Sequence, residues 1–213
     1  MLISHKHKFI VVNIPKTGCN SRVATLQHLG VIDVYGDGPK NSSTFLHNTF
    51  REIVKFHFQT DVYYSHYYKW GMVRNPWDFY VSSLNYNKVV VSDPAHIDHN
   101  RMLDWWCKCN KDDHIALKNI IQATGKVYTP QIEYLIDNNN NIVVDHIARF
   151  ENIDDEHKKF CEKVGIDPIP PLKHSNKSSR ANQKHFREYY TQELIDMVAE
   201  KEKGVIELMG YTI

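Results

Sequence analysis

The chain has 213 residues, the size of one ordinary domain that can bury its own hydrophobic core. Its 26 Lys and Arg residues nearly cancel its 25 Asp and Glu residues, which leaves a net charge of +1. That balance argues against binding to nucleic acid or to an acidic membrane through an overall positive field. Recognition of an anion therefore has to be local.

The N-terminal segment lacks the pattern of a targeting signal. Residues 1–8 are partly basic, but the apolar run that follows is short and ends at Asn13. It is too short for the apolar core of a signal peptide, and no later run approaches the length of a membrane span. We expect a cytoplasmic protein with a single domain over residues 1–213 and no membrane span.

The cysteine pattern predicts neither a disulfide scaffold nor a zinc site. The chain has four of them, at positions 19, 107, 109 and 161. Their number and irregular spacing do not fit a disulfide scaffold, and the C-x-x-C pairs typical of zinc sites are missing. We expect no bound metal.

The first predicted elements are a strand and a helix joined by a distinctive loop. Residues 8–14 read as a buried strand and residues 21–29 as a helix that ends at Gly30. The loop between them reads Asn-Ile-Pro-Lys-Thr-Gly-Cys-Asn from Asn13. A strand that stops at a Pro, passes through Lys-Thr-Gly and opens a helix presents backbone N–H groups beside a cation. This pattern predicts an anion site, most readily for phosphate.

The remaining elements alternate between helix and strand. Asn75 has the character of an N-cap, and a helix is predicted from Pro76 to about Asn85. The other predicted elements are a helix over residues 44–58, a buried strand ending at Val73, a turn at 138–141, a short strand at 142–145, and helices at 154–164 and 191–209. This alternation predicts an α/β fold with a mainly parallel sheet flanked by helices. Ligands sit at the carboxyl ends of such strands, where the Lys16 loop and Arg74 both fall.

The loop is not a Walker A motif, because Lys16 precedes Gly18 and the leading glycine of that motif is absent. The order disfavours a nucleoside triphosphatase. A small-molecule kinase remains an alternative, since residues 142–145, Ile-Val-Val-Asp, resemble a Walker B strand whose Asp145 could hold magnesium.

Several motifs together resemble the sulfotransferase family, including its Golgi carbohydrate, heparan-type and bacterial members. They are Pro-Lys-Thr-Gly-Cys-Asn-Ser at 15–21, Val-Arg-Asn-Pro-Trp-Asp at 73–78 with Val81-Ser82, Arg-Phe-Glu-Asn-Ile at 149–153, and Asn-Lys-Ser at 176–178 followed by Tyr189-Tyr190. The resemblance implies a P-loop-like sulfotransferase fold and the donor 3'-phosphoadenosine 5'-phosphosulfate (PAPS). It also implies transfer of a sulfuryl group to a hydroxyl, of a glycan or a small molecule, without a metal.

The resemblance also implies roles for individual residues. The donor's 5'-phosphosulfate end would be held by Lys16, Thr17, Gly18, Cys19, Asn20 and Ser21, its 3'-phosphate by Arg74 and Ser82, and its nucleotide covered by Lys177 and Ser178. Lys16 would stabilise the leaving phosphate oxygen. His47, in a segment similar to the family's H-A-T, would be the general base, with Glu52 and His66 as reserves.

Two departures from the family pattern leave a third hypothesis open. Cys19 and Asn20 stand where the family usually has Gly-Thr, and Phe79 stands where an Arg usually follows. Cys19 is expected to add bulk where the backbone approaches the phosphate. A module that binds the nucleotide but has lost catalysis is therefore an alternative. Gln131 and Arg149 also match family positions, or make structural hydrogen bonds. The acceptor and the oligomeric state are not determined by the sequence.

Overall fold

A computed structural model describes residues 1–35, 47–57, 64–92, 112–124, 128–173 and 184–213. The chain packs as two compact units, one formed by Met1–Arg74 with Thr129–Asn176 and the other by Asn75–Tyr128 with Lys177–Ile213. In the described ranges, no helix has the length and apolar character needed to cross a membrane.

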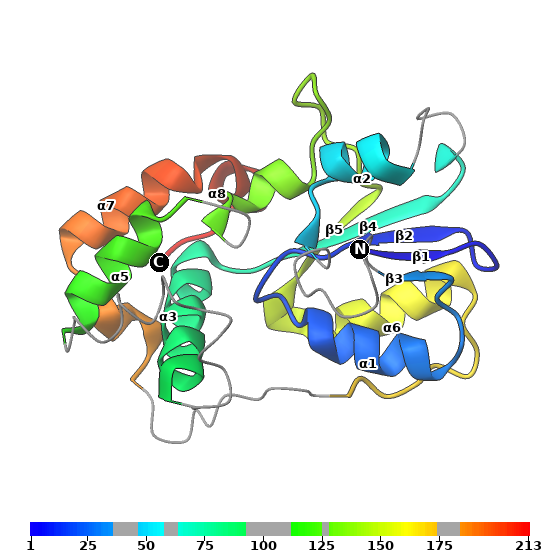
Figure 1. Cartoon of the computed structure of the whole chain (residues 1–213), viewed down its shortest axis with the longest axis horizontal. Coiled ribbons are helices and arrows are strands. Elements are labelled where there is room, and N and C mark those ends of the chain that lie inside the picture. The colour runs from blue at the N-terminus through cyan, green and yellow to red at the C-terminus, as the bar shows by residue number, and fades with distance from the viewer. Residues whose placement is uncertain (36–46, 58–63, 93–111, 125–127, 174–183) are drawn as a thin grey trace. The chain divides into compact units, whose positions relative to one another are not determined.

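The first unit is built on a five-stranded sheet with the order β3-β1-β2-β4-β5 (Figure 1). The strands are β1 (Leu2–Ser4), β2 (Phe9–Val12), β3 (Val34–Tyr35), β4 (Tyr68–Val73) and β5 (His146–Arg149). β2, β4 and β5 are parallel, as predicted, whereas β1 pairs antiparallel with both β2 and β3. The α/β fold is confirmed. The antiparallel strands are two and three residues long, too short to show a hydrophobic period.

Helices cover both faces of this sheet. α1 (Cys19–His28) and α6 (Ile153–Val164) lie on one face, and α2 (Phe50–His57) lies on the other (Figure 1). Phe160 of α6 packs against Phe9 and Trp70, with ring centroids 5.1 and 5.2 Å apart. A large apolar side chain that is fully buried in this way contributes about 1.5–3 kcal/mol. α1 ends as predicted, because Gly30 adopts a positive φ of 64° just beyond it.

The second unit is helical in its described part. It contains α3 (Pro76–Ser92), α5 (Asp113–Gln122), the 3₁₀ turn η8 (Phe186–Tyr189), α7 (Gln192–Lys201) and α8 (Lys203–Met209). The predicted N-cap is confirmed, since the Asn75 side chain accepts hydrogen bonds from Trp77 N and Asp78 N at 3.1 and 3.4 Å. Phe79 is fully buried in α3. Phe79 therefore serves apolar packing at a position where the family usually has an Arg.

Several predicted elements differ from the structure, and in the described part of the chain the helix expected over residues 44–58 begins only at Phe50. The single helix expected over residues 191–209 is divided at Glu202, a fully buried carboxylate that accepts a hydrogen bond from Tyr80 Oη at 3.0 Å. The strand expected at residues 142–145 is wrong: Ile142 forms only an isolated bridge with Ile136, and β5 begins at His146. The predicted turn at 138–141 is confirmed, with Asn140 at a φ of 63°.

Candidate anion site at the carboxyl edge of the sheet

The parallel strands bring three separate segments to one edge of the sheet. Because β2, β4 and β5 run in the same direction, the residues that follow their carboxyl ends meet at that edge. These residues are the loop from Asn13, Arg74 and the segment that begins at Phe150. The predicted placement of the Lys16 loop and Arg74 at one edge is confirmed.

The loop conformation leaves the N-terminus of α1 open to a ligand. Lys16 and Gly18 both have left-handed φ values, 61° and 76°. Gly18 is the N-cap residue of α1, and a glycine has no side chain with which to cap the helix. The N–H groups of a helix's first turn have no partner within the helix, and the helix dipole favours an anion near them. A Cβ on Gly18 would lie 2.5 Å from Ile153 Cδ1, so the R-F-E-N-I segment holds this turn closely.

Arg74 is fixed by contacts from three directions. Its backbone N–H donates to Gln131 Oε1, and Gln131 Nε2 donates to the Arg74 carbonyl, both at 2.9 Å. Its Nη1 donates to the Lys16 carbonyl at 3.0 Å, and its guanidinium lies 4.4 Å from the ring centre of Phe150. Gln131 is fully buried and makes the structural hydrogen bonds considered for it. These contacts hold Arg74 against the loop at residues 13–20, the anion loop.

Lys16 is the second positively charged side chain of this site, and its pKa is lowered. Burial, followed by the charge of Arg74, lowers the pKa of Lys16 to about 8, and Cys19 acts in the opposite direction. Two neighbouring cations that disfavour one another are stabilised when an anion binds between or beside them. This pair of cations gives the candidate site the sign of charge that an anionic ligand requires.

Two side chains of the loop point into the protein rather than toward a ligand. Thr17 is fully buried and its hydroxyl donates to the Ile14 carbonyl at 2.8 Å, while Cys19 Sγ lies 2.9 Å from the same carbonyl oxygen. The expectation that Cys19 adds bulk at the phosphate is wrong, because its side chain belongs to the hydrophobic core. Thr17 and Cys19 can meet an anion through their backbone N–H groups. Asn20 is exposed and Ser21 is buried.

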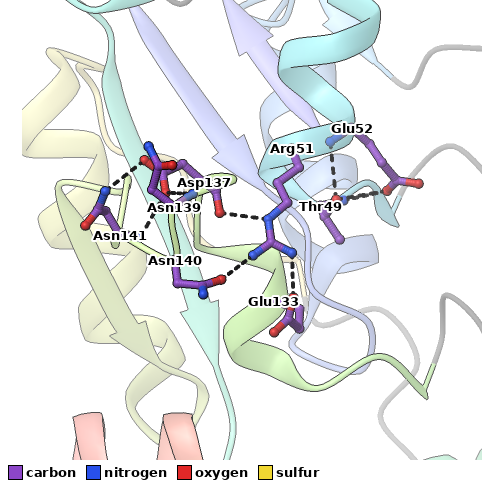
Figure 2. Close-up of polar contacts among 8 residues, drawn as sticks. All are labelled: Thr49, Arg51, Glu52, Glu133, Asp137, Asn139, Asn140 and Asn141. Carbon is purple, nitrogen blue, oxygen red and sulfur yellow. Dashed lines mark hydrogen bonds and ion pairs between the residues drawn. The ribbon is translucent and has the colours of Figure 1, made fainter.

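The three candidate bases lie in different places. His47 is beside the loop: its Nδ1 lies 3.0 Å from the Asn13 carbonyl oxygen, and it hydrogen bonds the Cys19 thiol. Glu52 caps α2 instead, since its carboxylate accepts from Thr49 N at 2.9 Å and its own N–H donates to Thr49 Oγ1 at 3.3 Å (Figure 2). His66 precedes β4 and is exposed at the opposite edge of the sheet.

A family model described as the sulfotransferase family matches residues 1–206. The chain belongs to the sulfotransferase family. No curated protein and no solved structure gave a match. Membership supports a transferase that moves a sulfuryl group, and the loop after β2 stands in this sulfotransferase domain where the sequence motifs predicted it.

The structure removes the feature that favoured a kinase over a sulfotransferase. Asp145 lies before β5, at the amino edge of the sheet, where its carboxylate accepts a hydrogen bond from Lys69 N at 2.7 Å. A Walker B aspartate would follow a strand at the carboxyl edge. Within the described ranges, no group of three or more His, Cys, Asp or Glu side chains is placed to hold a metal ion.

Three predicted donor contacts stay predictions for this sulfotransferase. Ser82 lies in α3 of the second unit, where it is half-buried. Lys177 and Ser178 lie outside the described residues, as do Cys107 and Cys109.

Sequence reasoning missed Arg22, which is 1 % exposed and lies directly behind the loop. The available signal was its spacing: Arg22 stands four residues before Leu26, on the face of α1 that packs into the core. A charged residue in that position indicates a buried polar contact.

Proposed function

We propose that this protein transfers a sulfuryl group from PAPS to a hydroxyl of a glycan or small molecule. The N-terminus of α1 with Lys16 would receive the 5'-phosphosulfate end of the donor, and Arg74 would receive its 3'-phosphate. The observation that carries the proposal is the cation pair: Arg74 donates to the Lys16 carbonyl at 3.0 Å, beside a helix start whose N-cap residue, Gly18, has no side chain. A donor with two separate phosphates uses both cations, and family membership supports the reaction class.

Lys16 has the properties needed to assist departure of the donor's phosphate. PAPS supplies an activated sulfuryl group, whose transfer leaves negative charge on the bridging phosphate oxygen. Lys16 is largely buried beside Arg74, and its ammonium form is stabilised by negative charge that develops next to it. Protonated Lys16 can therefore lower the barrier by holding this charge, or by donating a proton at Nζ.

His47 is placed to accept the acceptor's proton. Because a carbonyl oxygen only accepts hydrogen bonds, the 3.0 Å contact with Asn13 identifies Nδ1 as the protonated nitrogen of neutral His47. Nε2 is then the basic nitrogen. A neutral imidazole held in one tautomer beside the donor loop is suited to general-base catalysis.

Nucleotide preference tests the donor. Thermal unfolding is compared with 3',5'-ADP, with ATP and magnesium, and without ligand. We expect stabilisation by 3',5'-ADP of about 2.7 kcal/mol at a concentration 100 times its Kd, and little from ATP. Stabilisation by ATP with magnesium alone would contradict the proposal.

Transfer from radiolabelled PAPS to a panel of hydroxyl acceptors tests catalysis. In His47→Ala we expect kcat to fall about 10²- to 10⁴-fold, because a general base is lost, with unchanged affinity for 3',5'-ADP. His66→Ala is the matched control at the opposite edge and should retain wild-type kcat. Equal kcat in His47→Ala and wild type would remove His47 from the mechanism. Binding of 3',5'-ADP without transfer to any acceptor would instead support the inactive module.

A further inference from the structure

Arg22 is a buried cation that grips the anion loop from inside the protein. Its Nη1 donates to the Thr17 carbonyl at 2.6 Å and contacts Met72 Sδ at 3.1 Å. Its Nη2 lies 3.4 Å from Thr17 Oγ1 and 3.5 Å from Asn13 Oδ1, and its guanidinium is 5.0 Å from the ring centre of Trp70. One side chain thus joins the start of the loop to its central turn.

The hydrogen bond from Arg22 to the Thr17 carbonyl determines the direction of the next backbone N–H group in the loop. In a trans peptide the C=O and N–H groups point in opposite directions. Because Arg22 draws the Thr17 carbonyl into the protein, the N–H of Gly18 in the same peptide unit points away from Arg22. That N–H adjoins the first N–H groups of α1, which form the predicted anion nest.

Arg22 also needs a compensating negative charge, because a guanidinium stays protonated and its burial is costly. Within the described part of the chain, its hydrogen-bond acceptors include no carboxylate. The acidic group it does contact is Cys19, whose Sγ lies 3.6 Å from Nη2. A thiol that loses its proton here gains the attraction of this cation.

The surroundings of Cys19 favour its ionised form. Burial opposes ionisation, but a hydrogen bond with His47, the charge of Arg22 and a contact with Thr17 together lower the pKa of Cys19 to about 6. Burial and Arg74 lower the pKa of Lys16, and the charge of Cys19 acts on this lysine in the opposite direction. The charge of Arg22 also acts on His157, whose pKa is lowered first by burial and also by this arginine, while its hydrogen bond to Pro170 acts the other way. The neutral thiol donates to the Ile14 carbonyl, and ionisation exchanges that contact for the guanidinium of Arg22, whose Nη2 already lies 3.6 Å from Sγ.

We propose that Arg22 is a positioning residue that orients the anion loop, and that Cys19, as a thiolate, is its buried counter-ion. The first part rests on the proposed function, because its readout is donor binding. The second part does not depend on the ligand. Cys19, a departure from the family's usual residue, thereby acquires an electrostatic role.

The thiolate is measured by ultraviolet absorbance during a pH titration, with Cys19→Ser subtracted to remove the other cysteines. We expect a midpoint near 6 in the wild type. In Arg22→Met the midpoint should move toward the ordinary thiol value of about 8.5. Arg51→Met is the matched control, since Arg51 of α2 makes three hydrogen bonds away from this loop (Figure 2). A wild-type midpoint near the ordinary value, or one unmoved in Arg22→Met, would overturn the counter-ion assignment.

The positioning role is measured by calorimetric binding of 3',5'-ADP. We expect Arg22→Met to weaken binding about tenfold or more, because loss of the buried charged donor frees the Thr17 carbonyl. Arg22→Lys keeps the charge but not the two-pronged grip, so its affinity should be intermediate. The KM for the acceptor should stay unchanged in both variants, whereas a general loss of structure would also raise it.

The outcomes separate this inference from the proposed function. If wild-type protein does not bind 3',5'-ADP, the proposed donor is wrong. The thiolate titration still tests whether Cys19 is the counter-ion of Arg22. If Arg22→Met does not fold, Arg22→Lys decides. Wild-type affinity for 3',5'-ADP in Arg22→Lys would overturn the positioning role.

Discussion

The charged side chains at the two edges of the sheet have different neighbours. At the amino edge, Lys69 Nζ lies 3.3 Å from the Asp145 carboxylate. The Glu156 carboxylate lies 2.7 Å from His146 Nε2 and 3.0 Å from Lys159 Nζ. At the carboxyl edge, Lys16 faces Arg74, and burial together with this neighbour lowers its pKa. The amino edge pairs its cations with carboxylates, whereas at the carboxyl edge two cations lie side by side, as the proposed anion site requires.

The difference shows why an ion pair and a binding site can use the same residue types. A cation that already has a carboxylate contributes modest stability and attracts a ligand only weakly. A cation held beside another cation raises the free energy of the empty site, and an anion relieves that cost. Substitutions at the two edges should therefore have separable effects, on binding at one and on stability at the other.

Among substitutions that compare the two edges, the largest expected effect is on nucleotide binding in Arg74→Ala. Loss of a charge-assisted hydrogen bond to phosphate costs about 1.5–3 kcal/mol, so affinity for 3',5'-ADP should fall about 10- to 150-fold by calorimetry. The Gln131 contacts should survive, because they use the backbone of residue 74. Lys69→Ala is the control from the amino edge. Equal losses of affinity in both variants would erase the distinction between the edges.

Backbone geometry at the carboxyl edge is tested by Gly18→Ala. A left-handed conformation costs a residue with a Cβ about 1–2 kcal/mol, and the new methyl group would also press on Ile153. We expect a loss of about 2 kcal/mol in the free energy of unfolding, measured with urea. Gly30→Ala shares the positive φ but has open space around it, so it should lose about 1 kcal/mol. A larger loss in Gly30→Ala would show that Ile153 does not restrict the loop.

The pH dependence of binding should follow Lys16. Its free pKa of about 8 lies below the ordinary 10.5, so the empty protein loses this charge as pH rises through 8. An anion prefers the protonated form and raises the pKa. Affinity for 3',5'-ADP should therefore change little from pH 7 to 8 and fall above pH 8, by up to about tenfold per pH unit.

Lys16→Arg keeps its charge throughout this range and should flatten the profile above pH 8. A fall of equal size in Lys16→Arg would assign the titration to another group.

The smallest expected effect is on stability at the amino edge, in Glu156→Gln. Burial opposes ionisation of Glu156, but His146 and Lys159 lower its pKa below the ordinary 4.5. The stabilisation is therefore present above pH 4.5 and is lost as pH falls through the lower, folded-state pKa. We expect a loss of up to about 1 kcal/mol at pH 7, which shrinks toward pH 4, in urea unfolding. Affinity for 3',5'-ADP should not change, and a large change would link this edge to the site.

Much of the local structure could be predicted, because it depends on neighbours in sequence. Asn75 and Pro76 begin α3, and Gly30 follows the end of α1, since capping and positive φ are properties of a few adjacent residues. The strand, loop and helix around Lys16 were predicted on the same basis. Boundaries were less accurate: α3 continues to Ser92, beyond the predicted end near residue 85.

Other features depended on partners far away in the chain. The bridge between Ile136 and Ile142 left Asp145 outside a strand, and β5 formed instead where it could pair with β4. The break at Glu202 accompanies its contact with Tyr80, 122 residues away. No local pattern contains such information, because each partner is chosen by the packing of the whole unit.

The sequence by itself determined the anion loop, the arginine at the end of β4 and the family, since these are written in contiguous motifs. Only the tertiary structure decided which atoms of the loop face outward. Arg22 draws the Thr17 carbonyl inward and Cys19 lies against Ile14, so the backbone of the loop, rather than those two side chains, is left to meet a ligand. The direction of a side chain depends on what packs behind it, and here that is a buried arginine that the motif did not include.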